Sequence, residues 1–84
     1  MIFTVDLQLV QKTMDRMDAG IRRRILHAAY LLAHDPRPPG SKKLAGVADT
    51  WRIRVGDYRI IYIIEDDRLV VLIVKIGHRR EVYR

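Results

Sequence analysis

The chain has 84 residues, of which 16 are Lys or Arg and 10 are Asp or Glu, so its formal net charge at pH 7 is +6. A hydrophobic content of 49% excludes a disordered segment and the short length excludes a second domain, so we expect one packed domain over residues 1–84. The absence of Cys excludes disulfides, thiolate catalysis and cysteine-based metal sites. The sequence has neither a signal-peptide pattern nor an apolar run of roughly 20 residues, which predicts a soluble, cytoplasmic protein without a membrane partner.

The first half of the chain is predicted to form one strand and two helices. Residues 2–5 are β-prone, and Asp6 is a suitable N-cap for the helix that follows. That helix is expected over residues 7–17, where apolar side chains recur at helical spacing: Leu7, Val10, Met14 and Met17. A second helix with its own apolar stripe is expected over residues 21–34. Because only a short turn joins them, the two helices should form an antiparallel hairpin.

The second half is predicted to be β structure. A loop with three prolines over residues 35–40 ends the helical part, and residues 41–50 are expected to form an ordered surface loop. Strands are predicted over residues 51–55, 58–64 and 69–76. The order β-α-α-β-β-β predicts an α+β fold in which a helical hairpin packs on a largely antiparallel four-stranded sheet. Because the last two strands are apolar on both faces, the face away from the helices must be filled by other side chains or by a partner.

Two tight turns separate these strands. Gly56 precedes Asp57 in the first turn, and a Gly at the first central position suits a type II′ hairpin. Three adjacent acids, residues 65–67, form the second turn and are expected to be solvated.

Positive charge is concentrated in two segments of the β half. Residues 42–59 contain five basic and two acidic residues, and residues 75–84 contain four basic and one acidic residue, so each segment has a net charge of +3. Arg52 and Arg54 are two positions apart in a predicted strand and must therefore share a face. Taken alone, such a pair would most simply keep an exposed face of a sheet soluble.

The net charge of +6 favours a polyanionic partner, which could be nucleic acid, an anionic membrane or an acidic protein. A membrane surface would need a basic amphipathic helix, whereas the excess of charge lies in the β half, so a membrane is disfavoured. Arginine forks hold phosphates in a fixed geometry, and an aromatic ring such as that of Tyr83 offers a stacking platform for a base. Together these groups predict a site for single-stranded RNA. The three histidines lack the spacing of metal ligands, so we expect neither a metal nor another cofactor.

Three segments of the sequence carry a family pattern. They are Lys42-Lys43-Leu44-Ala45-Gly46, the strand pair from Trp51 to Tyr62, and the closing segment Lys75-Ile76-Gly77-His78-Arg79-Arg80-Glu81-Val82-Tyr83. With these segments the chain resembles the RelE/ParE toxin superfamily over essentially its whole length, and the closing segment favours the RelE branch. The resemblance implies the toxin of a type II toxin–antitoxin system, an endoribonuclease that cuts mRNA in the ribosomal A site and so inhibits translation. It also implies a cognate antitoxin that binds the toxin in a hetero-oligomer.

The same resemblance implies roles for individual side chains. Arg52 and Arg54 stand where the family has basic residues on its second strand, and Arg59 matches an arginine that contacts the scissile phosphate. Arg79 matches an arginine proposed as an acid or charge stabiliser, and Tyr83 matches a tyrosine that stacks on the substrate base. Further RNA contacts are expected from Lys42, Lys43, Arg80 and Arg84.

Metal-independent cleavage is chemically reasonable for such a site. The 2′-hydroxyl of RNA can attack the adjacent phosphate if the enzyme aligns the groups and neutralises the charge that develops. Because an arginine stays protonated in nearly any protein site, neither Arg52 nor Arg54 suits the role of general base. We therefore hypothesise that His78 assists proton transfer, since histidine is the side chain that ordinarily titrates near neutrality.

The weak set of acids and bases predicts low activity on free RNA, with the ribosome supplying substrate geometry. Two alternatives stay open. One is a ParE-like DNA gyrase inhibitor without nuclease activity, and the other is a basic nucleic-acid-binding domain without catalysis.

Overall fold

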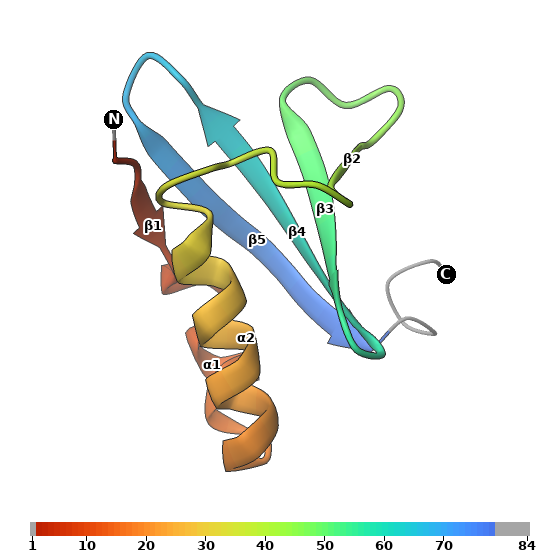
Figure 1. Cartoon of the computed structure of the whole chain (residues 1–84). Helices are drawn as coiled ribbons and strands as arrows, with labels where there is room; N and C mark the ends of the chain where they lie inside the picture. The colour runs from red at the N-terminus through yellow and green to blue at the C-terminus, as the bar shows by residue number, and fades with distance from the viewer. Residues whose placement is uncertain (1, 79–84) are drawn as a thin grey trace.

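A five-stranded sheet with helices on one face forms the fold, and the computed structural model describes it for residues 2–78 (Figure 1). The elements are β1 (Thr4–Asp6), the 3₁₀ turn η1 (Gln8–Val10), α1 (Gln11–Asp15), α2 (Ala19–Leu31), β2 (Lys42–Lys43), β3 (Thr50–Val55), β4 (Tyr58–Glu65) and β5 (Val70–His78). The strand order is β1-β5-β4-β3-β2, in which β1 is parallel to β5 and the other neighbouring strands are antiparallel. The predicted α+β fold, with helices packed on a largely antiparallel sheet, is therefore confirmed.

The described sheet has five strands, where the sequence predicted four. Lys42 and Lys43 form the additional strand β2 by pairing with Arg52 and Trp51. The sequence predicts a loop at these two lysines, since two residues are too few to show the alternation on which a strand prediction depends.

Both helices are shorter than their apolar spacing predicts. The turn η1 and the helix α1 replace a continuous helix over residues 7–17, and the Asp6 carboxylate accepts a hydrogen bond from the backbone N–H of Gln8 (2.9 Å). Helix α2 begins at Ala19 because Asp18 caps it, accepting a hydrogen bond from the N–H of Gly20 (3.1 Å). It ends at Leu31 rather than near residue 34, because the N–H groups of Ala33 and His34 donate to carbonyl oxygens three residues back, those of Tyr30 and Leu31, so the last turn is of the tighter 3₁₀ type.

The core lies between the helices and one face of the sheet. Alternate residues of β4 from Ile60 to Ile64 are buried there, because alternate side chains of a strand share a face. The sheet contributes Ile53, Ile60, Tyr62, Ile64, Val71, Ile73 and Ile76 to this core, and the helical part contributes Val10, Met14, Ile25, Ala29 and Leu32.

A β-bulge interrupts the pairing of β4 with β5. Ile61 lies opposite Lys75, but Tyr62 lies opposite Ile73, so Val74 is the extra residue. An extra residue reverses the alternation of the strand that contains it. Ile73 and Ile76 are therefore both buried against the helices although they are three positions apart.

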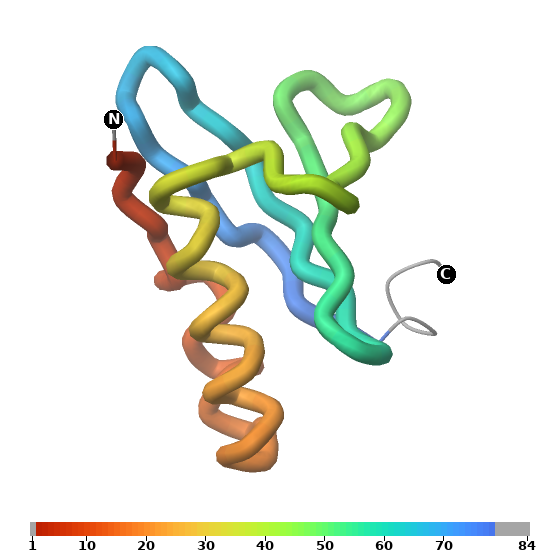
Figure 2. Tube along the Cα trace, viewed as in Figure 1, coloured from red at the N-terminus to blue at the C-terminus, as the bar shows by residue number. Residues whose placement is uncertain are grey.

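The connection from α2 to β2 crosses the helix-bearing side of the sheet (Figure 2). It is anchored there by Tyr62, which is fully buried and whose hydroxyl donates a hydrogen bond to the carbonyl oxygen of Pro36 (2.7 Å). The opposite face of the sheet carries half-buried apolar residues, as the two-sided apolar strands predict: Ile61, Ile63, Val70, Leu72 and Val74.

The β3–β4 turn has the geometry that its sequence predicts. Gly56 has a φ of +59°, which a type II′ turn requires at its first central position. A guanidinium nitrogen of Arg24 lies 3.2 Å from the point where a Cβ of residue 56 would stand, so the helix also leaves little room for a side chain. Among residues 2–78, no helix has the length and apolar character needed to cross a membrane.

Candidate nucleic-acid interface

Basic side chains gather on the face of the sheet that is turned away from the helices. Directly paired residues of adjacent strands point to the same side of a sheet, and the register aligns Lys42, Arg52, Ile61 and Lys75 in one row across four strands. A second row contains Arg54, Arg59 and Gly77. Because neighbouring strands are only about 4.8 Å apart, the two rows bring cations from distant parts of the sequence together. We call this surface the basic face; its residues are Lys42, Arg52, Arg54, Arg59 and Lys75.

Lys75 is the member of the basic face that the site prediction from the sequence missed. Strict alternation from Ile73 would place Lys75 on the buried side, but the bulge at Val74 turns it to the basic face, where it is exposed. One signal of this was present in the sequence, because a lysine is almost never fully buried. A strand of otherwise apolar residues that contains a lysine must either turn the lysine to an exposed face or change the alternation of its side chains.

Arg59 differs from the other cations of the basic face in its burial. Only 7% of its surface is exposed, and one of its guanidinium nitrogens donates a hydrogen bond to the carbonyl oxygen of Tyr58 (3.2 Å). The residue opposite it in β5 is Gly77, which has no side chain to compete for the space. The other cations of the basic face are more accessible than Arg59: Lys42, Arg54 and Lys75 are exposed, and Arg52 is half-buried.

Two of the predicted site residues lie on the other side of the sheet. Lys43 pairs with Trp51, whose side chain packs against the core, so Lys43 and its neighbour Lys42 point to opposite faces. His78 pairs with Tyr58, and the two rings meet edge to face at 5.7 Å. Because Tyr58 also packs against the core, the structure does not bring His78 together with the arginines of the basic face.

Four of the predicted site residues lie outside the described part of the chain. They are Arg79, Arg80, Tyr83 and Arg84.

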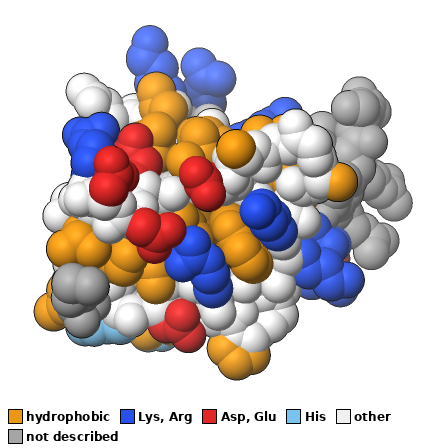
Figure 3. Space-filling view, turned by 90° about the horizontal axis from the view of Figure 1, so that it is seen from above, with side chains coloured by type: hydrophobic (Ala, Val, Ile, Leu, Met, Phe, Trp, Pro, Cys, Tyr) orange, Lys and Arg blue, Asp and Glu red, His pale blue; other side chains and the backbone are white. Residues whose placement is uncertain are grey.

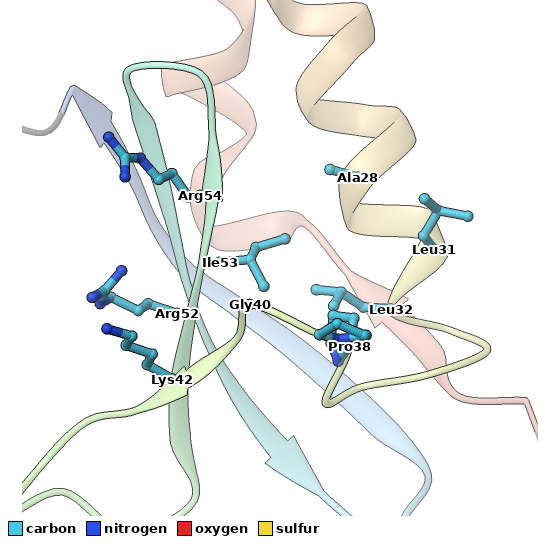
Figure 4. A pocket seen from close by; sticks show the side chains of 10 residues that line it. Ala28, Leu31, Leu32, Pro38, Gly40, Lys42, Arg52, Ile53 and Arg54 are labelled. Carbon is cyan, nitrogen blue, oxygen red and sulfur yellow. The ribbon is translucent and has the colours of Figure 1, made fainter.

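A groove of about 440 Å³ lies beside the outer edge of β3, between the end of α2 and the proline-containing loop. Ile53 points into this groove, whereas Arg52 and Arg54 extend to the other side of the strand together with Lys42 (Figure 4). The ladder between β2 and β3 ends at Arg52, so the backbone that follows borders the groove. Three cations of the basic face, Lys42, Arg52 and Arg54, therefore also border the groove, whose other lining residues are mostly apolar.

Acidic residues are concentrated in the β4–β5 turn, at the opposite end of β4 from the β3–β4 turn. There Asp66 accepts two hydrogen bonds from the guanidinium group of Arg37 (2.9 and 3.4 Å), and this interaction lowers the pKa of the Asp66 carboxyl. Glu65 pairs with Arg68 in the same turn (3.2 Å). Seen from above, this end of the molecule displays acidic and basic side chains side by side rather than one sign of charge (Figure 3).

The chemistry available on the basic face is electrostatic. Guanidinium groups bind phosphate oxygens in pairs and keep their charge at any ordinary pH, so they can position a phosphodiester and stabilise added negative charge on it. Among residues 2–78, no group of three or more His, Cys, Asp or Glu is placed to hold a metal ion.

Comparison with known proteins gives one family over most of the chain. A family model described as the ParE toxin of the type II toxin–antitoxin system parDE matches residues 6–83. Toxin RelG of Mycobacterium tuberculosis is 34% identical to this chain over 53 residues. That match covers 63% of this chain and 61% of RelG, which is less than two thirds of the relative's length.

Solved structures extend the likeness to nearly the whole chain. The archaeal RelE–RelB complex from Pyrococcus horikoshii matches with a TM-score of 0.80 and 31% identity, covering 96% of this chain and 99% of the matched one. The toxin–antitoxin complex RelBE2 from M. tuberculosis matches with a TM-score of 0.80 and 26% identity, covering 94% and 100%.

Proposed function

The chain belongs to the ParE toxin family of type II toxin–antitoxin systems, within the RelE/ParE superfamily, and on that premise we propose that it is an endoribonuclease that cleaves mRNA in the ribosome and so inhibits translation. The observation that carries this proposal is the basic face, on which three strands, β2, β3 and β5, bring Lys42, Arg52, Arg54 and Lys75 together beside the buried Arg59 of β4. A polyvalent cationic surface of this kind suits the phosphate backbone of a single RNA strand.

The cleavage step requires alignment and charge neutralisation. The 2′-oxygen of one nucleotide forms a bond to phosphorus while the bond from phosphorus to the 5′-oxygen of the next nucleotide breaks, which leaves a 2′,3′-cyclic phosphate and a 5′-hydroxyl. The 2′-hydroxyl gives up its proton, and the departing 5′-oxygen takes one. Arg52 and Arg54 of the basic face would hold the phosphate and stabilise the extra negative charge of the transition state.

Proton transfer is the part of this reaction that the basic face is least suited to perform. Arginine is a poor general base, and His78 lies on the other side of the sheet. This favours slow cleavage of free RNA and a requirement for the ribosome, which would hold the mRNA in the reactive geometry. Arg79 and Tyr83 remain part of the proposal as the charge stabiliser and the stacking platform that the family resemblance implies.

A second candidate function is inhibition of DNA gyrase by binding, without nuclease activity. The description of the matching family model, which names the ParE toxin, favours it. The basic face supports the nuclease instead, because a binding inhibitor does not need a row of cations aligned for phosphates.

We also propose a cognate antitoxin as the partner of this chain. Two of the similar solved structures are toxin–antitoxin complexes. A chain with a net charge of +6 and half-buried apolar side chains on the sheet face turned away from the helices suits an acidic, partly disordered partner that folds on binding.

Induction of the protein in growing cells tests the proposed function, with mapping of mRNA 5′ ends and of DNA breaks in the same culture. We expect mRNA cuts that keep a fixed phase relative to codons and carry 5′-hydroxyl ends, and we expect the variant Arg52→Ala/Arg54→Ala to lose them. DNA breaks without such cuts would support the gyrase inhibitor instead. Rapid cleavage of purified RNA without ribosomes would contradict the ribosome requirement.

Arg68→Ala is a matched control for this experiment. Arg68 is an exposed arginine in the β4–β5 turn, away from the basic face, and it pairs with Glu65. We expect this variant to cut mRNA like the wild type, because it removes one positive charge without changing the basic face.

A further inference from the structure

The loop that connects α2 to β2 is held by contacts from three different parts of the chain. We call residues 35–41 the proline loop. Its Arg37 stacks over the ring of Trp51 at 5.4 Å and forms a two-pronged ion pair with Asp66 in the β4–β5 turn. The hydroxyl of Tyr62 holds the same loop through the carbonyl oxygen of Pro36 (2.7 Å).

The backbone of the proline loop is itself stiff. The Asp35 carboxylate accepts a hydrogen bond from the N–H of Arg37 (3.1 Å), which closes a small turn at the start of the loop. At the end of the loop, the N–H of Ser41 donates to the carbonyl oxygen of Pro38 (3.0 Å), and Gly40 has a φ of +89°. Proline at the second position and a positive φ at the third are the signature of a type II turn.

This stiff loop delivers the chain directly into β2. Lys42 follows the type II turn at once and pairs with Arg52, the first arginine of the basic face. Strand β2 has only two residues, so its own ladder cannot hold it firmly. The position of Lys42 beside Arg52 therefore depends on where the proline loop ends.

We propose that Arg37 is a positioning residue that fixes Lys42 on the basic face, although Arg37 itself lies on the helix side of the sheet. This inference rests on the proposed function, because it assigns to Lys42 a contact with an RNA phosphate. Arg37 acts by fastening the proline loop to Trp51 and Asp66, and the stiff loop carries this restraint into β2. Its own guanidinium group does not contact the substrate.

The fastening is suited to positioning rather than to general stability. The side chains of Arg37 and Asp66 are 41% and 57% exposed, and exposed ion pairs contribute little to the stability of a fold. Loss of Arg37 should therefore leave the core intact and loosen the loop and β2.

A double-mutant cycle on Arg37 and Lys42 tests the inference. Binding of a short single-stranded RNA with a non-cleavable 2′-deoxy substitution is measured against salt concentration for Arg37→Gln, Lys42→Ala and the double variant. We expect Lys42→Ala to weaken binding by about 3- to 10-fold and to reduce the salt slope by about 0.7, the contribution of one phosphate contact. Arg37→Gln should have a smaller effect of the same kind, and the double variant should bind like Lys42→Ala alone. Effects that multiply in the double variant would overturn the inference, as would full binding by Arg37→Gln.

Arg68→Gln serves as the control, because it breaks the exposed ion pair with Glu65 in the same turn that holds Asp66 but does not touch the proline loop. It should bind RNA as the wild type does. Asp66→Asn is a second variant in the event that Arg37→Gln does not fold, and it should reproduce a part of the Arg37 effect.

Hydrogen exchange separates failure of this inference from failure of the proposed function. The amides of Ser41 and Leu44 flank β2, and each donates a backbone hydrogen bond, to Pro38 and Thr50 respectively. Arg37→Gln should speed their exchange, and Arg68→Gln should not. If the wild type does not bind RNA and Lys42→Ala changes nothing, the proposed function fails and with it the role of Lys42. If the wild type binds RNA but these two amides exchange in Arg37→Gln as in the wild type, the positioning role of Arg37 is wrong.

Discussion

Replacement of Lys75 by Ala tests the basic face at the residue that only the register reveals. Lys75 stands in one row with Lys42 and Arg52 because the bulge at Val74 reverses the alternation of β5. If all exposed cations of the basic face contact phosphates of a single strand, each contributes about 0.7 to the slope of log K against log salt. The Lys75→Ala slope should therefore be shallower by about 0.7. Between 50 and 200 mM salt, the advantage of the wild type over the variant should then shrink by about 2.6-fold.

The assay is fluorescence anisotropy with a short labelled single-stranded RNA at several salt concentrations. Lys43→Ala is the matched control, because it removes the same charge from a residue on the helix side of the sheet. We expect its slope to equal that of the wild type. Equal changes for Lys43→Ala and Lys75→Ala would refute the reasoning, because they would show that binding responds to net charge rather than to contacts placed by the register.

Four further predictions concern stability and proton transfer. Tyr62→Phe removes the buried hydrogen bond to Pro36 and should lower the free energy of unfolding by about 1 to 2 kcal/mol in urea at pH 7; an unchanged value would show that the bond is not needed to hold the loop. Burial raises the pKa of Tyr62 to about 12 from an ordinary value of 10.0, so the folded state favours the neutral phenol. The free energy of unfolding should therefore be constant below pH 10 and fall by about 2 to 3 kcal/mol between pH 10 and 12. Tyr62→Phe should lack this part of the loss. His78→Gln should have the same pH–rate profile of mRNA cleavage as the wild type, because His78 packs on Tyr58 away from the basic face. A shifted profile would show that His78 takes part in proton transfer. Gly56→Ala should lower the free energy of unfolding by about 1 to 2 kcal/mol, since φ is +59° and a guanidinium nitrogen of Arg24 stands 3.2 Å from the position of the new methyl group. A melting temperature equal to that of the wild type would contradict the turn assignment.

The candidate site was predictable from the sequence where it depends on one strand. The alternation of Trp51, Ile53 and Val55 with Arg52 and Arg54 is a local pattern, and the structure keeps it in β3. The type II′ turn at Gly56 is equally local, because only the backbone of that residue decides it.

The site was not predictable where it depends on how strands pair. The sequence patterns do not indicate that Lys42 and Lys43 form a strand, that they separate to opposite faces, or that His78 follows Tyr58 to the helix side. Each of these features results from the register of strand pairing, which joins residues that are 8 to 20 positions apart in the sequence. The burial of Arg59 opposite Gly77 has the same origin.

Apolar periodicity, turn residues and the excess of positive charge are properties of short stretches, so the sequence by itself determined the α+β class, the helical hairpin, the family and the common side of Arg52 and Arg54. The tertiary structure alone decided the fifth strand, the bulge that exposes Lys75 and the contact of Arg37 with Trp51 and Asp66. The physical reason is that pairing between strands and contacts across a loop are fixed by the packing of the whole core. A single inserted residue in one strand is enough to send every later side chain to the other face.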